Sequence, residues 1–558
     1  MEKTWTQDKV VYQIYPKSFQ DTTGKGTGDL QGIISHLDYL HFLGVDILWL
    51  TPVYPSPQVD NGYDVADYCA IDPRYGTLDD FDQLVAEAHQ RNLKIMMDMV
   101  FNHTSTQHPW FIQACDPHSP YHPYYIWRDS PPDIPPTNWQ SKFGGPAWQW
   151  QPECGQHYLH LFSKEQADLN WEHPPVREAL KDVCRFWAAR GVDALRLDVV
   201  NLISKPEQFR DDPDGDGRRF YTDGPRVHEF LQEMNRDVFR PLNLITVGEM
   251  SSTSLQHCQQ YASCDNTELS MVFNFHHLKI DYADGDKWTR MAPDVIALKK
   301  IFALWQSGMH QRANGALFWC NHDQPRVVSR LGCEGKHREI SAKMLAMVLY
   351  GMQGTPYLYQ GEEIGMTNAG FTDLGQYRDV ESLNIARILN RQGHSMADIL
   401  AILGAKSRDN SRTPMQWDDT KHAGFTTGTP WLDCNVNHRQ INVMSALRDP
   451  HSVLYCYRSL IRLRKQLTLL QYGDYHDLSP DRPDIWCYRR CWQGQMLLVV
   501  ANLTDNPCDW QPPGVEQEGT YTLIISNMPD TPRVPRPGQL SPYQAAWWLF
   551  TPAPSPAP

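Results

Sequence analysis

Short apolar runs alternate with amphipathic stretches along most of the chain. "VVYQIY" precedes "LQGIISHLDYLHFLG", "VDILWLTPV" precedes "LDDFDQLVAEAHQRN", and "LKIMMDMVFN" is a third run. The runs have the length of buried strands, and the stretches between them repeat apolar residues at helical spacing. After a gap the pattern resumes with "VDALRLDVV", "LITVGEM", "GALFWCNHD" and "TPYLYQGEE". Repeated strand–helix units with buried strands predict an α/β fold, a (β/α)8 TIM barrel.

Two segments depart from this pattern. Residues 103–170 are too many for an ordinary strand–helix loop and are rich in Pro, Trp and Tyr, which predicts a small inserted domain that overhangs the barrel. From about residue 475, alternating runs such as "IWCYRRCW" and "QMLLVVANL" predict an all-β sandwich. The predicted domains are therefore 1–102 and 171–474 for the barrel, 103–170 for the insert, and 475–558 for a C-terminal domain with a Pro-rich tail.

Composition limits what this chain can bind. The 558 residues are 41% hydrophobic, which is enough for a large core. The 51 basic and 65 acidic residues give a net charge of −14, which disfavours nucleic acid or an anionic membrane as partner. The sequence has no long apolar span and no secretory signal, and its 13 cysteines lack CxxC spacing. We expect a cytoplasmic monomer without membrane contact.

Polar residues end several of the predicted strands. In a TIM barrel the C-terminal ends of the strands build the active site, so these side chains should converge. One carboxylate at a strand end is equally well explained as a helix cap or an ion pair, but four strand ends together favour an active site. The residues are Asp98, Asn102, His103, Arg196, Asp198, Glu249, His322 and Asp323.

Five sequence blocks carry a resemblance to a known family. "DMVFNH", "QADLN", "GVDALRLDVV", "VGEM" and "NHD" occur in this order, and together they resemble the α-amylase family of glycoside hydrolases, in its oligo-1,6-glucosidase-like branch. The resemblance implies that Asp198 is the nucleophile, Glu249 the general acid/base, and Asp323 the carboxylate that stabilises the transition state. Such a retaining reaction needs one ionised and one protonated carboxyl group.

Neighbouring residues suit these roles. Arg196 is two residues before Asp198 on the same strand face and can keep that carboxylate ionised, whereas Glu249 needs surroundings that raise its pKa. His103 and His322 have no metal-ligand partners at suitable spacing. We interpret them as hydrogen-bond donors to sugar hydroxyls, with structural histidines as the alternative.

The resemblance also implies a pocket for one terminal glucose. In "VDNGYD", Asp60 and Tyr63 combine a carboxylate with an aromatic ring, which suits hydrogen bonding and stacking on a sugar. In "KSRDNSRTPMQW", one of Arg408 and Arg412 should reach the same sugar, although a structural ion pair is as good an explanation for either. Val199, directly after Asp198, resembles branch members that act on linkages other than α-1,4. This leaves isomaltose-like α-1,6 substrates, trehalose and phosphorylated trehalose.

A basic segment favours the phosphorylated substrate. In "FNFHHLKIDYADGDKW", His276, Lys279 and Lys287 lie just beyond the sixth strand, where the leaving sugar should bind. Ammonium and imidazole groups can hold a 6-phosphate, although a solvated charge run is the alternative. We expect a retaining hydrolase that splits trehalose 6-phosphate into glucose and glucose 6-phosphate. The alternatives are a glucosidase acting on neutral isomalto-oligosaccharides and an inactive transporter subunit or binding protein.

Two acidic loops raise the question of a cation. "DTTGKGTGDL" resembles the calcium loop of oligo-1,6-glucosidases, but Lys25 occupies a ligand position, so we expect its ammonium either between Asp21 and Asp29 or in solvent. "DPDGDGRRFYTD", residues 212–223, has EF-hand spacing but Arg219 at its eighth position, which favours a surface loop. We expect no metal and no cofactor.

Overall fold

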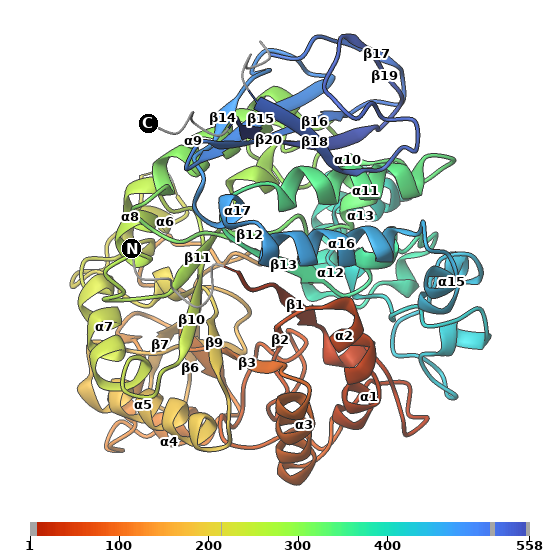
Figure 1. Cartoon of the computed structure of the whole chain (residues 1–558). Coiled ribbons are helices and arrows are strands. Elements are labelled where there is room, and N and C mark those ends of the chain that lie inside the picture. The colour runs from red at the N-terminus through yellow and green to blue at the C-terminus, as the bar shows by residue number, and fades with distance from the viewer. Residues whose placement is uncertain (1–7, 214, 514–518, 554–558) are drawn as a thin grey trace.

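The structure, a computed structural model, describes residues 8–213, 215–513 and 519–553. Its centre is an eight-stranded parallel sheet with the order β11-β10-β9-β3-β2-β1-β13-β12. A parallel bridge between Val272 and Gly315 joins the two outer strands, so the sheet closes into a barrel (Figure 1). This confirms the predicted fold. The strands are β1 (Val11–Ile14), β2 (Ile47–Leu50), β3 (Lys94–Met99), β9 (Ala194–Leu197), β10 (Ile245–Met250), β11 (Met271–Asn274), β12 (Ala316–Leu317) and β13 (Thr355–Tyr359).

Side chains fill the interior of the barrel. Trp49 of β2 lies 5.8 Å from Phe273 of β11 and 6.1 Å from Tyr357 of β13, ring centre to ring centre, although these strands are not neighbours. The other strand faces pack against surrounding helices, so every strand is buried on both sides. Among these helices are α1 (Leu30–Ser35), α3 (Leu78–Gln90), α5 (Pro174–Ala189), α9 (Val295–Met309), α11 (Arg338–Tyr350) and α16 (Val453–Gln466).

The insert after β3 contains two small antiparallel sheets. One pairs β4 (His103–Ser105) with β8 (Gln166–Asp168), and the other has the order β5-β7-β6 (Trp127–Arg128, Gln156–Leu159, Trp148–Gln151). The base of the insert is fixed to the barrel, because the Lys205 ammonium lies 2.7 Å from both the Asp168 carboxylate and the Asn102 amide oxygen. The insert therefore starts and ends beside the end of the third barrel strand.

An antiparallel domain follows the barrel. Its main sheet has the order β14-β15-β16-β20-β18 and a second pair joins β17 to β19 (Figure 1). Trp510 of the pair stacks on Trp548 of the main sheet at 5.7 Å. The predicted all-β domain is confirmed, whereas residues 554–558 of the tail lie outside the described part, and the domain boundaries stay predictions. The strands are β14 (His476–Asp477), β15 (Ile485–Trp492), β16 (Gln495–Asn502), β17 (Cys508–Trp510), β18 (Gly519–Ser526), β19 (Gly538–Leu540) and β20 (Ala545–Pro552).

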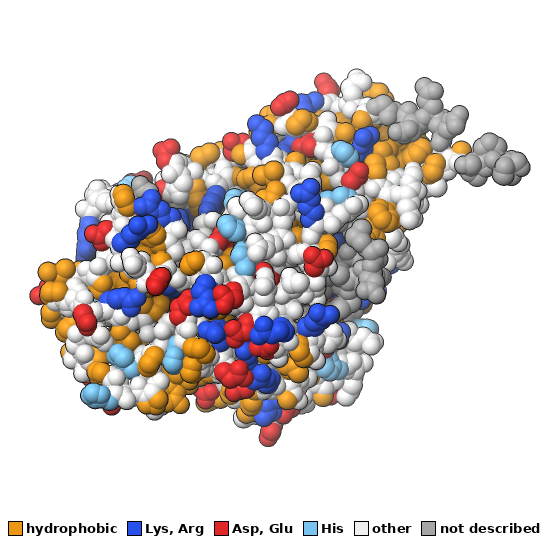
Figure 2. All heavy atoms as spheres, turned by 90° about the vertical axis from the view of Figure 1, so that its left-hand side faces the viewer, with side chains coloured by type: hydrophobic (Ala, Val, Ile, Leu, Met, Phe, Trp, Pro, Cys, Tyr) orange, Lys and Arg blue, Asp and Glu red, His pale blue; other side chains and the backbone are white. Residues whose placement is uncertain are grey.

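Charged side chains of both signs are interspersed on the surface. On the face shown in Figure 2, basic and acidic groups lie next to one another. On α5, for example, the Arg185 guanidinium lies 2.7 Å from carboxylate oxygens of both Glu178 and Asp182. Within the described ranges, none of the helices combines the length and the apolar character needed to cross a membrane.

The glycine-rich loop around Lys25 is held by its own hydrogen bonds. The Asp21 carboxylate accepts from backbone N–H groups of the loop and from the Thr426 hydroxyl at 2.5 Å. Asp29 caps α1 by accepting from the Gly32 N–H at 2.7 Å. The Lys25 side chain is exposed. Of the two placements predicted for Lys25, the structure has the solvent-facing one.

We expect this loop to be independent of calcium, because N–H and O–H donors already surround the oxygens of Asp21 and Asp29. Thermal unfolding and glycoside hydrolysis should give the same Tm and the same rates after treatment with EDTA and after addition of Ca²⁺. A calcium-dependent rise in Tm that disappears in Asp21→Asn would contradict this expectation.

The second acidic loop does not direct its first and last acids to one point. Asp212 accepts from the Gly217 N–H at 3.0 Å and forms an ion pair with Arg219 at 3.0 Å. Asp223 instead accepts from the hydroxyls of Thr253 and Tyr261. Residue 214, the third position of the pattern, lies outside the described residues, so the expected absence of a metal stays a prediction.

Candidate active site

The predicted nucleophile and acid/base lie side by side. β9 and β10 are parallel neighbours with Arg196 opposite Val247, so Asp198 and Glu249, each two residues further along, meet at the same end of the barrel. Arg196 joins them: one guanidinium nitrogen lies 2.5 Å from Asp198 and the other 2.7 Å from Glu249. The convergence predicted from the strand ends therefore exists for these two carboxyl groups.

Arg196 is shared among three carboxylates. It is fully buried, and the nitrogen that contacts Asp198 also lies 2.8 Å from Asp98. Tyr63 donates its hydroxyl to the other oxygen of Asp98 at 2.9 Å. Three buried carboxylates around a single guanidinium would carry excess negative charge, so retention of a proton by one of them is favoured.

Glu249 is the carboxyl group that retains this proton. Burial, together with the nearby negative charges of Asp198 and Asp323, raises the pKa of Glu249 to about 8, against the opposing effect of Arg196. Burial also raises the pKa of Asp198, but Arg196 acts more directly on that carboxylate and favours its ionised form. The arrangement thus provides a proton donor beside a carboxylate nucleophile, as a retaining glycosidase requires.

The residue after Asp198 has a strained backbone. Val199 has φ 36° and ψ 39°, in the left-handed region that β-branched residues avoid. Its N–H donates to the Glu249 carboxyl at 3.1 Å. Its side chain packs in a cluster with Trp139 and Leu161 of the insert, which stabilises the turn. This turn therefore directs the Val199 N–H to the Glu249 carboxyl group.

Asp323 is held ionised. Its oxygens lie 2.7 Å from Arg412, 3.4 Å from Arg408 and 3.2 Å from Nε2 of His322. Burial would raise the pKa of Asp323, but His322 and the two arginines outweigh it and bring that pKa well below its usual range. The segment after the seventh strand therefore presents a carboxylate whose ionised form is favoured.

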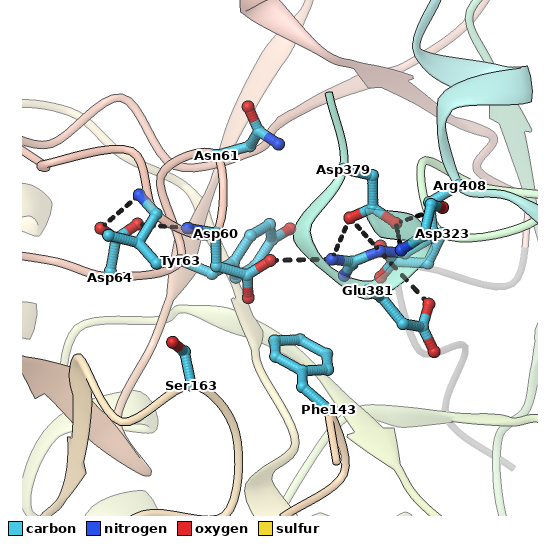
Figure 3. A network of polar contacts seen from close by, with 12 residues as sticks. Asp60, Asn61, Tyr63, Asp64, Phe143, Ser163, Asp323, Asp379, Glu381 and Arg408 are labelled. Atoms are coloured by element: carbon cyan, nitrogen blue, oxygen red, sulfur yellow. Dashed lines mark hydrogen bonds and ion pairs between the residues drawn. The ribbon is translucent and has the colours of Figure 1, made fainter. Parts of the chain in front are cut away.

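Arg408 connects Asp60 with Asp379 and Asp323 (Figure 3). Its guanidinium lies 2.9 Å from Asp60 and 2.5 Å from Asp379, and it also approaches Glu381 at 3.6 Å. Arg412 is more deeply buried and donates to the carbonyl oxygen of His322 at 2.8 Å. Both predicted arginines form ion pairs, and Arg408 alone contacts Asp60 and Asp323 together among the contacts of the described residues.

His322 and Tyr63 form a stacked pair beneath the pocket. Their rings are 5.2 Å apart and 5° from parallel. The Gln13 side-chain amide lies 2.7 Å from Nδ1 of His322, and burial lowers the pKa of His322 to about 3. With Nδ1 accepting from Gln13, the neutral ring carries its proton on Nε2, beside Asp323. This geometry suits donation to a sugar hydroxyl.

His103 has a more enclosed environment. Its Nε2 lies 3.1 Å from the Tyr63 carbonyl oxygen and 3.2 Å from the amide nitrogen of Gln166, which also donates to Asp60 at 3.1 Å. Burial lowers the pKa of His103 to about 4, so the ring is neutral. The structure thus connects His103 to Asp60 and Tyr63, and its predicted contact with the sugar stays a prediction.

The three basic residues predicted to bind phosphate occupy two places. Lys279 is exposed, and its ammonium lies 3.4 Å from the Ser252 hydroxyl. Burial, and then the charge of Lys279, lower the pKa of His276, which packs against Trp305. Lys287 instead forms an ion pair with Glu381 at 2.7 Å. Lys279 and His276 therefore lie near the end of β10, whereas Lys287 lies on the side of Arg408.

Several site residues were not predicted from the sequence. Asp379 holds Arg408, Gln166 supports Asp60, and Phe143 places its ring 5.1 Å from the Arg408 guanidinium. Figure 3 shows Phe143 of the insert beside the contact between Asp60 and Arg408. The basic and aromatic pair in "SKFGG" was the available signal for this part of the insert.

Comparisons with known proteins identify the family of this chain. Residues 13–473 match the model of the α-amylase catalytic domain. The chain is 63% identical to a trehalose-6-phosphate hydrolase of Escherichia coli (strain K12), over 98% of each protein, and 45% identical to an oligo-1,6-glucosidase of Halalkalibacterium halodurans, over 98% of this chain and 99% of that protein. The crystal structure of a trehalose-6-phosphate hydrolase from Bacillus licheniformis superposes with a TM-score of 0.95 at 51% identity, covering 98% of this chain and 100% of that one.

The match to the family covers most of the chain and includes Asp198, Glu249 and Asp323. The resemblance inferred from the five sequence blocks is confirmed. The chain belongs to the α-amylase family of glycoside hydrolases.

Proposed function

We propose that this protein is a retaining trehalose-6-phosphate hydrolase, which releases glucose and glucose 6-phosphate. The main structural support is the position of Lys279. Its ammonium lies 3.4 Å from the hydroxyl of Ser252, three residues after Glu249. Glu249 protonates the leaving sugar, so a cation on this side suits a negatively charged leaving group. The relatives named for this activity at 63% and 56% identity support the same substrate.

In the proposed mechanism, an Asp198 oxygen attacks the anomeric carbon while Glu249 donates its proton to the glycosidic oxygen. The bond to the leaving glucose 6-phosphate breaks and a covalent glucosyl–enzyme forms. Glu249, now ionised, removes a proton from water, which attacks the same carbon and frees Asp198. Asp323 stabilises the positive charge that develops on the sugar ring.

The remaining predicted residues hold the terminal glucose in this proposal. Arg408 closes the pocket between Asp60 and Asp323, and Tyr63 and His322 form its floor. A pocket closed in this way admits one terminal sugar, which fits cleavage of a disaccharide. His103 contacts the backbone carbonyl of Tyr63 and Arg412 that of His322, and these contacts hold the two rings in position.

The neutral-substrate and inactive alternatives are less well supported. The carboxylates expected to be missing from an inactive binding protein are all in place around Arg196 and Arg412. A glucosidase for neutral oligosaccharides would have no use for a cation beside Ser252. We retain a cytoplasmic location and a monomer in the proposal. Buried free thiols such as Cys184, Cys258 and Cys320 suit a reducing compartment.

The pH dependence should follow the two catalytic carboxyl groups. Because Asp198 must be ionised and Glu249 protonated when the leaving group needs a proton, kcat/KM for an alkyl α-glucoside should be bell-shaped. On the acidic side, kcat/KM should fall as Asp198 gains a proton. On the basic side, kcat/KM should fall through about pH 8, because Glu249 loses its proton there. A pH–rate profile measures both limbs. A basic limb near pH 5 would mean that burial does not raise the pKa of Glu249, contrary to the proposed acid.

Removing the predicted phosphate ligands should discriminate between substrates. In Lys279→Ala/Lys287→Ala, we expect KM for trehalose 6-phosphate to rise by roughly ten-fold or more, because charged hydrogen bonds are lost. The ratio of kcat/KM for trehalose 6-phosphate to that for a neutral aryl α-glucoside should fall by a similar factor. Steady-state kinetics with both substrates provides this ratio.

General damage to the pocket would lower both activities together and leave the ratio unchanged. If the double variant processes trehalose 6-phosphate as well as the parent does, the proposed phosphate contact fails and the neutral oligo-1,6-glucosidase alternative becomes the better one.

A further inference from the structure

Two lysines from distant segments face adjacent serines next to Glu249. The ammonium of Lys142, in the insert, lies 3.4 Å from the hydroxyl of Ser251, and that of Lys279 lies 3.4 Å from the hydroxyl of Ser252. Asn201 fixes the turn through hydrogen bonds of 2.9 and 2.8 Å to the N–H and carbonyl of Ser251. The turn therefore presents both ammonium groups at a defined place after the end of β10.

These lysines lack carboxylate partners within the described ranges. Neither Lys142 nor Lys279 has an aspartate or glutamate oxygen within 4.0 Å there. Lys142 is partly buried, with its ammonium 5.6 Å from the ring centre of Tyr221. Burial, then Arg218 and Lys279, lower the pKa of Lys142 to about 7. Burial, and then Arg218 at the start of α6 (Arg218–Tyr221), also lower the pKa of Lys279. Arg218 contacts Asp216 at 3.5 Å, so within the described ranges the two lysines are the cations of this group without a carboxylate partner, and their mutual repulsion favours a bound anion.

The cluster lies on the leaving-group side of the pocket. Glu249 acts electrostatically on Lys142, so this lysine is near the group that protonates the leaving oxygen. The next residue, Phe143, instead contacts Arg408 on the side of the terminal glucose. Adjacent residues of the insert thus face the two sugar positions. Lys287 is not part of this cluster, because its ammonium forms an ion pair with Glu381.

We propose that Lys142, together with Lys279 and Arg218, forms the subsite for the phosphomonoester of the leaving sugar, and that Lys142 is a specificity-determining residue of the insert. This inference rests on the proposed function. A phosphate dianion has three terminal oxygens and accepts charge-assisted hydrogen bonds from several ammonium and guanidinium donors at once. The serine hydroxyls that now contact the lysines keep both ammonium groups oriented before the substrate binds.

The test compares Lys142→Met with Lys164→Met, which removes the same charge from an exposed position elsewhere in the insert. The substrates are trehalose 6-phosphate, trehalose and an aryl α-glucoside. We expect Lys142→Met to lower the ratio of kcat/KM for trehalose 6-phosphate to that for the aryl glucoside by about ten-fold or more, mainly through KM. Lys142→Arg should restore part of the loss, and Lys164→Met should match the parent.

Inorganic phosphate provides a readout without turnover of the charged substrate. It should inhibit hydrolysis of the aryl glucoside competitively in the parent, and about ten-fold more weakly in Lys142→Met. Arg218→Met should also weaken inhibition by phosphate. This variant provides a second test if Lys142→Met folds poorly.

The outcomes separate this inference from the proposed function. If the parent cleaves trehalose 6-phosphate no better than trehalose, the proposed function itself fails. If the parent prefers trehalose 6-phosphate but Lys142→Met and Arg218→Met both keep the parent ratio and the parent inhibition by phosphate, the subsite lies elsewhere and this inference is overturned while the function stands.

Discussion

In Asp198→Asn, kcat should fall by about 10⁴-fold or more on both trehalose 6-phosphate and an aryl α-glucoside, a loss of about 5.5 kcal/mol in transition-state stabilisation. An amide does not displace the leaving sugar, so the covalent intermediate cannot form. Folding should be retained, because Asp198 is one of three carboxylates that share Arg196 and its neutralisation relieves repulsion. Steady-state kinetics and thermal unfolding on the same preparation measure both effects.

The expected Tm is equal to or above that of the parent, as for other active sites that concentrate like charges. A variant with near-normal rates would exclude double displacement through Asp198. A variant with low rates and a much lower Tm would indicate that the carboxylate is structural.

Glu249→Gln should give a defect that depends on the leaving group. Trehalose 6-phosphate has a poor leaving group that needs the proton, so kcat/KM should fall by about 10³-fold or more. A 4-nitrophenyl glucoside needs no proton to leave. It should still react with Asp198, release a burst of nitrophenol, and then stall, because no base activates the water.

Azide identifies the role of Glu249 directly, since this anion attacks without a general base. It should restore turnover of the nitrophenyl glucoside in Glu249→Gln and yield the α-glucosyl azide, with the configuration of the substrate retained. The β-glucosyl azide would mean that Glu249, rather than Asp198, occupies the face of the nucleophile.

The barrel was predictable because its strands are buried on both faces and so appear as continuous apolar runs. The extent of each strand was not predictable to the same degree. In "GALFWCNHD" the hydrophobic run is long, yet β12 contains only Ala316–Leu317. The seam with β11 consists of a bridge between Val272 and Gly315, and hydrophobicity alone does not distinguish this loose seam from a full ladder.

The convergence of the carboxylates proposed to be catalytic was predictable, because the two-residue period of a strand places Arg196, Asp198 and Glu249 on neighbouring, inward-facing positions. The contribution of Asp379 to the site was not predictable, because this residue also fits a local helix-capping pattern. It caps α12 (Val380–Arg391) by accepting from the Ser382 N–H, as many aspartates do. Its second role, holding Arg408, depends on a contact that the sequence does not show.

The lysines predicted to bind phosphate show the same limit of prediction from the sequence. The sequence indicated that Lys279 and Lys287 follow the sixth strand, but not that Glu381, 94 residues after Lys287, pairs with it. Lys142 was missed because the insert has little regular periodicity from which to predict where a side chain lies. Long-range ion pairs decide which cations face a ligand, and these follow from tertiary structure.

A comparison of kcat/KM for trehalose 6-phosphate, trehalose and isomaltose with the parent protein, side by side at one ionic strength, tests the central claim most directly. The proposed phosphate contact with Lys279 predicts that trehalose 6-phosphate is preferred over trehalose by roughly ten-fold or more, and that added salt narrows the difference because the contact is partly screened. Isomaltose cleaved as well as or better than trehalose 6-phosphate would contradict the account and make this protein a neutral oligo-1,6-glucosidase.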